Sequence, residues 1–177
     1  KRLFKTAMDR FGKIDILVNN SGAFDGGPVD KITVDQWNRV IGVNVTGMFL
    51  GIREVFPIMK RQGGGRIINI GSIAAQRARH SSVPYTTSKH AVWGLTQASA
   101  LEGRDFGIAV SCIHPGNTEV ERRSGGKSST GRDEGPEPSI GTNDIGQTAL
   151  IMATLPQGSN MLEAIVLPLS QDYLGRG

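Results

Sequence analysis

Cysteine is almost absent from the sequence, and this scarcity excludes one class of protein. Cys112 is the only cysteine in 177 residues, so no disulfide can form within the chain, and small secreted proteins that depend on disulfides are excluded. Because Cys112 lies in an apolar run, we expect a buried and inert thiol. The shortage of cysteine also favours a cytoplasmic protein.

Long apolar runs and a strong net charge are lacking as well. No apolar stretch reaches the roughly 20 residues that span a bilayer, and the first ten residues lack the apolar centre of a signal peptide, so no membrane association is expected. The 20 Lys and Arg against 16 Asp and Glu leave a net charge of +4, without a long basic run. This charge is too weak to indicate nucleic-acid binding, although it suits an anionic cofactor.

What the sequence does contain is an alternation of helical and strand patterns. Its length fits one domain covering residues 1–177, with a substantial core. Each expected strand is a continuous apolar run, which is typical of strands covered on both faces, and the segments between strands allow parallel crossovers. We therefore predict an α/β fold with a doubly wound parallel sheet. Helices are expected over residues 1–11, 34–60, 84–102 and 144–155, and strands over residues 14–18, 66–70, 108–113 and 164–167.

The long second helix carries start and stop signals. Thr33 and Gln36 have the spacing of a capping box at its beginning. Pro57 near its end, followed by the glycine run 63–65, is expected to terminate it.

Residues 117–141 break the pattern of helices and strands. They are rich in Gly, Ser, Arg, Glu and Pro and show no period. This composition indicates either a mobile loop beside an active site or a surface insertion.

Tyr85 and Lys89 place a phenol and an ammonium on one face of the third helix, because residues four apart on a helix are neighbours. A nearby cation favours the phenolate, so the pair can transfer protons at neutral pH. By itself, however, this spacing most often marks a half-exposed helix face.

Ser72 and Asn44 are two further candidates. Ser72 follows the second strand, where open α/β sheets gather their ligands. Its hydroxyl can hold a substrate oxygen or bond the backbone of a local turn. Asn44 is a polar residue in an apolar stretch of a helix. It either bonds neighbouring backbone or holds a water and a lysine in a proton relay, and the two roles are compatible.

Loops rich in polar residues or glycine follow three successive strands. Asn19, Asn20, Ser21 and Gly22 come directly after the first strand, and His114, Pro115 and Gly116 after the third. Because parallel strands end at one edge of the sheet, these loops are expected to face the same site.

Five of these motifs, in this order, resemble those of the short-chain dehydrogenase/reductase family. Residues 19–22 are similar to its N-N-A-G motif, with Ser21 in place of the alanine, and Tyr85 with Lys89 to its Y-x-x-x-K pair. Asn44 and Ser72 match its catalytic asparagine and serine, and Pro115-Gly116 its P-G motif.

This resemblance implies a Rossmann-type fold, a hydride transfer between NAD or NADP and a small-molecule alcohol or carbonyl substrate, and four catalytic residues. Tyr85 would be the general acid/base and Ser72 would position the carbonyl. Lys89 would lower the pKa of Tyr85 and bind the nicotinamide ribose, and Asn44 would hold a water linked to Lys89. No metal site is implied. The residues expected to bind the cofactor are Asn19, Ser21, Gly22, Tyr85, Lys89, Pro115, Gly116 and Thr118.

The sequence departs from the family pattern in one large respect. The family's glycine-rich phosphate loop and the strand that selects NAD or NADP are missing, and residues 63–65 precede a strand rather than follow one. We therefore expect a sheet incomplete in its N-terminal half, in a chain that is part of a longer polypeptide. Family members associate through the two long helices, which implies a homodimer or homotetramer. The alternative function is a catalytically silent scaffold or regulatory subunit of the same fold.

Overall fold

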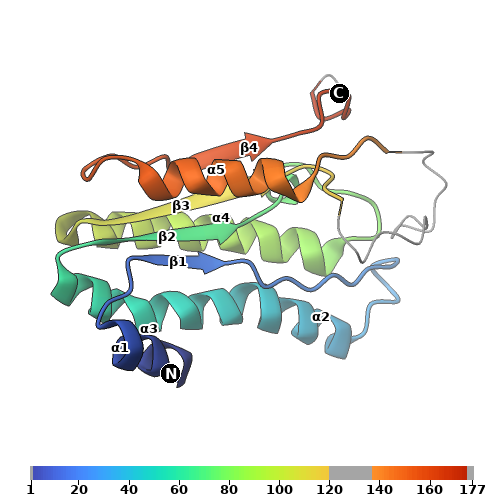
Figure 1. The fold of residues 1–177 in the computed structure, drawn as a ribbon. Helices are drawn as coiled ribbons and strands as arrows, with labels where there is room; N and C mark the ends of the chain where they lie inside the picture. Colours follow the sequence, from blue (N-terminus) through green and yellow to red (C-terminus); the bar gives the residue numbers. More distant parts are fainter. Residues whose placement is uncertain (1, 120–136, 175–177) are drawn as a thin grey trace.

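The computed structural model describes residues 2–119 and 137–174. Within these residues, four strands form one parallel sheet in the order β1-β2-β3-β4 (Figure 1). The order of the strands in space follows their order in the sequence, so each crossover joins neighbouring strands. The expected α/β class with a doubly wound parallel sheet is confirmed. The strands are β1 (Ile16–Asn19), β2 (Gly65–Ile70), β3 (Ile108–Pro115) and β4 (Glu163–Val166).

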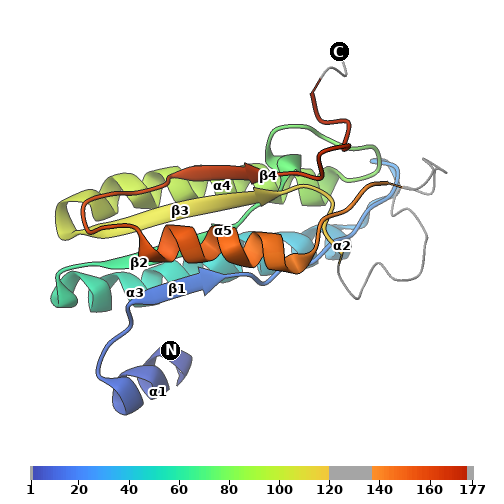
Figure 2. The ribbon, with the colours of Figure 1, turned by 45° about the horizontal axis from the view of Figure 1, so that its top comes forward.

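Helices cover both faces of the sheet (Figure 2). On one face lie α3 and α4, and on the other lies α5. Each helix lies close to the range expected from the sequence. The α-helices are α1 (Arg2–Phe11), α2 (Val34–Ile41), α3 (Gly47–Gln62), α4 (Val83–Gly103) and α5 (Thr142–Thr154), with 3₁₀ turns at Ile73–Ala75 and Arg104–Phe106.

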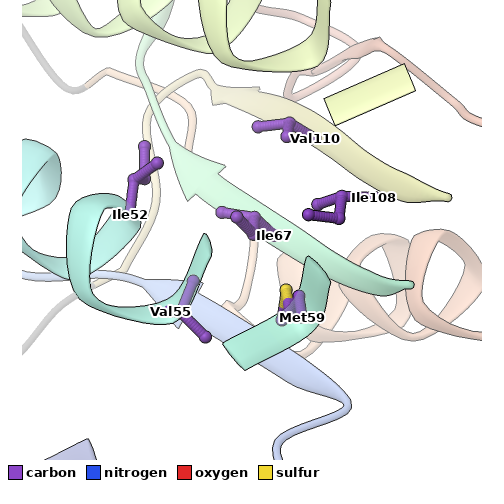
Figure 3. Close-up of a cluster of buried hydrophobic side chains, with 6 residues drawn as sticks. All are labelled: Ile52, Val55, Met59, Ile67, Ile108 and Val110. Atoms are coloured by element: carbon purple, nitrogen blue, oxygen red, sulfur yellow. The ribbon is translucent and has the colours of Figure 1, made fainter. Parts of the chain in front are cut away.

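The core has two layers because side chains alternate across a strand. On one face of the sheet, Ile67 of β2 packs against Val55 of α3 within a larger apolar cluster. On the other face, the next residue of β2, Ile68, packs against Met152 of α5. The first cluster is shown in Figure 3 and contains Ile52, Val55, Met59, Ile67, Ile108 and Val110.

The helix expected over residues 34–60 is in fact two α-helices joined by one π-helical segment, Gly42–Thr46. Its start is confirmed: Thr33 and Gln36 form both hydrogen bonds of a capping box. Of the two expected stop signals, the glycine run is confirmed, because the helix ends where Gly63 adopts a left-handed conformation with φ 78°, whereas Pro57 lies inside α3 and does not end it. Proline removes only one helical hydrogen bond, whereas a left-handed residue reverses the chain direction.

The outer strands do not match the expectation that every strand is covered on both faces. In β2 and β3 most residues are buried, but Ile16 and Val18 of β1 and Ile165 of β4 are exposed in the described structure. The apolar run of an edge strand therefore resembles that of a central strand in the sequence, although fewer elements cover it.

Within the described residues, one helical stretch, Val34–Gln62, is long and apolar enough by composition to cross a membrane. This stretch carries charged residues such as Arg39, Arg53 and Glu54, so it is not a continuous apolar run of the kind that the sequence lacks. It is weak evidence for a span, since core helices of soluble proteins meet the same criterion. Val40, Ile52 and Val55 of this stretch are buried inside the protein.

Cys112 is a free, fully buried cysteine on β3, as its apolar surroundings in the sequence indicated. Burial, the dominant cause, raises the pKa of its thiol to about 11. The reactive thiolate is therefore scarce at neutral pH, which confirms the prediction of an inert thiol.

The core predicts a large difference between two otherwise identical substitutions. Val55→Ala removes two methyl groups from a side chain with 0% exposure, whereas Val29→Ala removes them from one with 71% exposure. Val55→Ala should lower the free energy of unfolding by about 2 kcal/mol through lost burial and a residual cavity. Val29→Ala should change it by less than about 0.5 kcal/mol. Urea unfolding of both variants checks this, and equal effects would contradict the assignment of the core.

Candidate active site

The candidate site lies at the carboxyl ends of β1, β2 and β3, which point to the same edge of the sheet (Figure 1). The first turn of α4 begins at this edge and carries Tyr85. Because parallel pairing aligns the strand ends, segments far apart in the sequence meet here. The sequence prediction of a shared site at these loops agrees with this arrangement.

Tyr85 and Lys89 lie on the same face of α4. The Lys89 side chain is only 4% exposed, and its Nζ donates a 2.9 Å hydrogen bond to the carbonyl of Ile70 at the end of β2. The same Nζ lies 5.6 Å from the centroid of the Tyr85 ring. The same half-buried ring also contacts Phe24, with 5.2 Å between centroids. The phenol therefore lies near both an aromatic ring and a buried cation, contacts that the spacing of the two residues does not predict.

Ser72 begins the 3₁₀ turn Ile73–Ala75 directly after β2. Its Oγ accepts a 3.1 Å hydrogen bond from the backbone N–H of Ala74. A hydroxyl that accepts one hydrogen bond keeps its own proton for donation. The turn contact and the binding of a substrate oxygen are thus compatible roles of the same side chain.

Asn44 lies fully buried in the π-helical segment between α2 and α3. Its side chain pairs with both backbone groups of Ala23, accepting from the N–H at 2.7 Å and donating to the carbonyl at 2.9 Å. It also donates to Oγ of Ser88 at 2.9 Å. The structural role expected for Asn44 is confirmed, and its part in a proton relay stays a prediction.

Ser88 is a residue of the site that the sequence analysis missed. Its hydroxyl donates to the carbonyl of Tyr85 at 2.7 Å and accepts from Asn44, so it ties the turn of α4 with Tyr85 to the π-helical segment. The one feature of the sequence that could have indicated Ser88 is its position about one helical turn after Tyr85. Serine in that position usually bonds its own helix, so only the tertiary contact reveals this role.

The side chain of Asn19 points into the protein. Its Nδ2 donates to Oδ1 of Asn69 at 2.9 Å, and Asn69 donates in turn to Thr96 of α4 at 3.0 Å. Asn19 therefore links the ends of β1 and β2, and cofactor binding by this residue stays a prediction. Ser21 and Gly22 are exposed, and a Cβ added to Gly22 would meet nothing within 4 Å.

The loop after β3 is held by a residue near the C-terminus. The backbone N–H of Asn117 donates to Oε1 of Gln171 at 2.9 Å, and a Cβ on Gly116 would collide with the same oxygen. A larger residue at position 116 would therefore have to displace the Gln171 side chain from this hydrogen bond. The hydroxyl of Thr118 donates to the carbonyl of Gly116 at 3.2 Å, so this side chain stabilises the loop itself.

The two ends of the segment 117–141 are joined, since Thr118 forms a parallel bridge with Ile140. Beside them, Arg79 pairs with Glu137 at 3.0 Å and donates to Oδ1 of Asn117 at 3.1 Å. Residues 120–136 lie outside the described residues. The expectation of a mobile substrate loop falls mostly on them, so it stays a prediction.

A comparison with protein families matches residues 1–129 to the model described as short chain dehydrogenase. The chain is 40% identical over 126 residues to trans-4-hydroxycyclohexanecarboxylate dehydrogenase of Sinomonas cyclohexanicum, covering 71% of this chain and 48% of that protein. It is 45% identical over 111 residues to 3-alpha-(or 20-beta)-hydroxysteroid dehydrogenase of Mycobacterium bovis, and the match covers 63% of this chain and 43% of that protein. The chain thus spans about half the length of these curated relatives.

Among solved structures, the chain is similar to a gluconate 5-dehydrogenase of Burkholderia cenocepacia in complex with NADP and tartrate. The TM-score is 0.81 at 27% identity, and the match covers 93% of this chain and 67% of the other. The likeness therefore extends beyond the family-model match, to the part of the chain that carries α5 and β4.

The hydrogen bonds of Asn44 predict a loss of stability when its amide is removed. Asn44→Ala leaves two part-buried backbone groups of Ala23 without their partner, so the free energy of unfolding should fall by about 2–4 kcal/mol. The control is Asn38→Ala on the exposed face of α2, expected to change it by less than about 0.5 kcal/mol. Urea unfolding compares the two, and an Asn44→Ala protein as stable as the wild type would refute the structural role.

Proposed function

Because the chain belongs to the short chain dehydrogenase family, we propose that it is an NAD- or NADP-dependent oxidoreductase that interconverts an alcohol and a carbonyl compound. The observation that carries this proposal is the Tyr85 phenol held beside the buried Lys89 ammonium. The pair lies at the sheet edge where Ser72 follows β2. All four residues that the family resemblance marks as catalytic are retained, which argues against a silent scaffold.

In the proposed mechanism, Tyr85 holds the proton that moves. During reduction its hydroxyl protonates the oxygen of the carbonyl substrate, and during oxidation its phenolate removes the proton of the alcohol. The Lys89 ammonium lies 5.6 Å from the centroid of the Tyr85 ring, so its positive charge attracts the negative charge that develops on the ring as the proton leaves. The Ser72 hydroxyl donates to the same substrate oxygen and orients it. The nicotinamide, when bound, supplies or accepts the hydride.

The residues at the strand ends fit the nicotinamide end of a dinucleotide. Gly22 is exposed with open space around it, so a ligand can approach the backbone closely. Pro115 and Gly116 lie at the end of β3, and Thr118 follows them. We assign the binding of the cofactor to Asn19, Ser21, Gly22, Tyr85, Lys89, Pro115, Gly116 and Thr118.

For the substrate we propose a secondary alcohol on an aliphatic ring or chain. The two curated relatives carry names that describe a hydroxycyclohexanecarboxylate and a hydroxysteroid as substrates. The 4-hydroxyl of the first and the 3-alpha hydroxyl of the second are secondary alcohols on rings, and the 20-beta hydroxyl is a secondary alcohol on a side chain. This shared chemistry supports the class. We also propose that the protein is cytoplasmic, with no membrane or nucleic-acid partner.

A homodimer or homotetramer is the proposed assembly, formed through the long helices. Fewer residues of these helices are available for an interface than the sequence suggests. Those buried in the core, which cannot contact another chain, are Val40, Ile52, Val55 and Val92. Val43 and Phe49 are partly exposed along the joined helices α2 and α3. These two side chains are the better candidates for an interface.

Tyr85→Phe tests the proposed chemistry, because it deletes the transferable proton and almost no contact area. In the polypeptide as its gene encodes it, turnover of a secondary alcohol with NAD or NADP should fall at least about 100-fold. The dissociation constant of the cofactor should change less than about threefold. The matched control is Thr87→Ala, which alters an exposed residue of the same helical turn and should keep full turnover.

Two outcomes of this experiment would reject the proposal. Tyr85→Phe with more than about a tenth of the wild-type turnover would remove Tyr85 from the mechanism. A wild-type protein that turns over no secondary alcohol or ketone, and binds neither dinucleotide in a titration, would favour the scaffold instead.

The proposed assembly predicts a mass of two or four chains in sedimentation at micromolar concentration. Phe49 is 45% exposed and Val29 is 71% exposed. Phe49→Glu places a charge in the proposed interface, so this variant should sediment at a lower mass. Val29→Glu, outside the long helices, should leave the mass unchanged. A monomeric wild type contradicts the assembly.

A further inference from the structure

His114 is a buried polar residue that the proposed mechanism does not use. It lies near the end of β3, and its side chain has 0% exposure. Its Nδ1 lies 2.9 Å from the backbone carbonyl oxygen of Ser72. The ring of Trp93 meets the imidazole edge-on, with 5.5 Å between centroids. The imidazole therefore contacts both Trp93 and the backbone of Ser72, the serine that is proposed to bind the substrate.

Gly71 provides the space for this contact. A Cβ at this position would lie 2.7 Å from Nδ1 of His114 and 2.8 Å from Sγ of Cys112. Any larger residue directly before Ser72 would push the ring away from the carbonyl. The contact between His114 and Ser72 therefore depends on a glycine that the chain supplies at the required place.

The surroundings of the ring decide which nitrogen carries the proton. Two backbone groups of Ser72 face Nδ1, the carbonyl oxygen at 2.9 Å and the N–H at the longer distance of 3.4 Å. Because the carbonyl oxygen can only accept and is the closer of the two, the geometry favours Nδ1 as the N–H donor. In a neutral imidazole Nε2 then has a lone pair. Among the described residues Nε2 makes no hydrogen bond, although Oε1 of Glu163 lies 3.3 Å away.

The charges around His114 act in both directions on its pKa. Burial is the largest influence and lowers the pKa of the imidazole. The Ser72 carbonyl and Glu163 raise it, while Lys89 lowers it. The net direction is downward from an ordinary value near 6.5, so the ring is neutral at pH 7 and above. A neutral imidazole carries only one N–H, and the contact with the Ser72 carbonyl favours that proton on Nδ1.

Glu163 connects this contact to the C-terminal part of the chain. Its Oε1 accepts a 2.6 Å hydrogen bond from Nε2 of Gln76, and Oε1 of Gln76 accepts from the hydroxyl of Tyr173. Gln76 directly follows the 3₁₀ turn that Ser72 begins. The turn is thus held at its start by His114 of β3 and at its end by residues of β4 and the segment after it.

We propose that His114 is a positioning residue for Ser72, which it holds through a hydrogen bond from Nδ1–H to the serine backbone carbonyl. This inference rests on the proposed function, because it gives Ser72 a substrate oxygen to orient. The Ser72 hydroxyl also caps its own turn through Ala74, so a rotation of the Ser72 peptide would move the hydroxyl. Displacements of about 1 Å at such a site can lower turnover about 100-fold.

Two substitutions at His114 separate positioning from packing. The side-chain amide nitrogen of asparagine is as far from the backbone as Nδ1, so His114→Asn keeps a donor for the Ser72 carbonyl. His114→Leu fills a similar volume without a donor. In the polypeptide as its gene encodes it, His114→Leu should lower kcat about 10- to 100-fold with little change in cofactor affinity. His114→Asn should keep kcat within about fivefold of the wild type.

The control is Ser111→Ala, which removes another buried hydrogen bond of β3, from Oγ to Asn160, away from Ser72. It should lower stability and leave kcat unchanged. If His114→Leu keeps wild-type kcat, or if both His114 variants lose kcat equally, the positioning role is overturned. If the wild type itself shows no turnover, the proposed function fails, and the tautomer of His114 still tests the contact.

Nitrogen NMR of the wild-type histidines reads the tautomer directly, without any need for activity and even if His114→Leu does not fold. The His114 ring, assigned by its absence from the spectrum of His114→Asn, should be neutral at pH 7 with its proton on Nδ1. Free histidine prefers the proton on Nε2, so this result would support the hydrogen bond to Ser72. A proton on Nε2 of His114 at pH 7 would overturn the proposal.

Discussion

Parallel hydrogen bonding between β1, β2 and β3 is the constraint on which the rest of the site depends. Because the strands run in the same direction, Asn19, Asn69 and the segment after Ile113 arrive at one edge of the sheet. The helix that follows β2 must return across the sheet to reach β3, so its first turns start at this edge with Tyr85. A different strand direction would send these residues to opposite ends of the molecule.

Around this edge, three buried side chains each bond a backbone carbonyl from a distant part of the chain. Asn44 bonds Ala23, Lys89 bonds Ile70 and His114 bonds Ser72. A buried polar group without a partner is costly, so each contact holds both the side chain and the loop that it bonds. These contacts explain how irregular loops form an ordered surface. Because buried side chains hold the loops of the site, the reacting groups can be fixed in position before the substrate binds.

The secondary structure followed from local patterns, with errors where local rules compete. The glycine run after residue 62 ended α3, and the capping box at Thr33 began α2, because each acts within one helical turn. Pro57 did not end the helix, since the hydrogen bonds around it continued. The π-helical segment at Asn44 was not predictable from periodicity. It coincides with hydrogen bonds to Ala23, which lies 21 residues earlier in the chain.

The α/β class and the candidates Tyr85, Lys89, Ser72 and Asn44 followed from the sequence alone. Apolar periodicity and capping residues predicted the helices and strands because they act locally, and the resemblance of five motifs to a known family identified the candidates. Only the tertiary structure decided which atoms these residues meet: that Asn19 faces Asn69, that Ser88 joins Asn44 to α4, and that His114 reaches the carbonyl of Ser72. The physical reason is that a hydrogen bond depends on distances of about 3 Å between groups whose separation along the chain does not determine their separation in space.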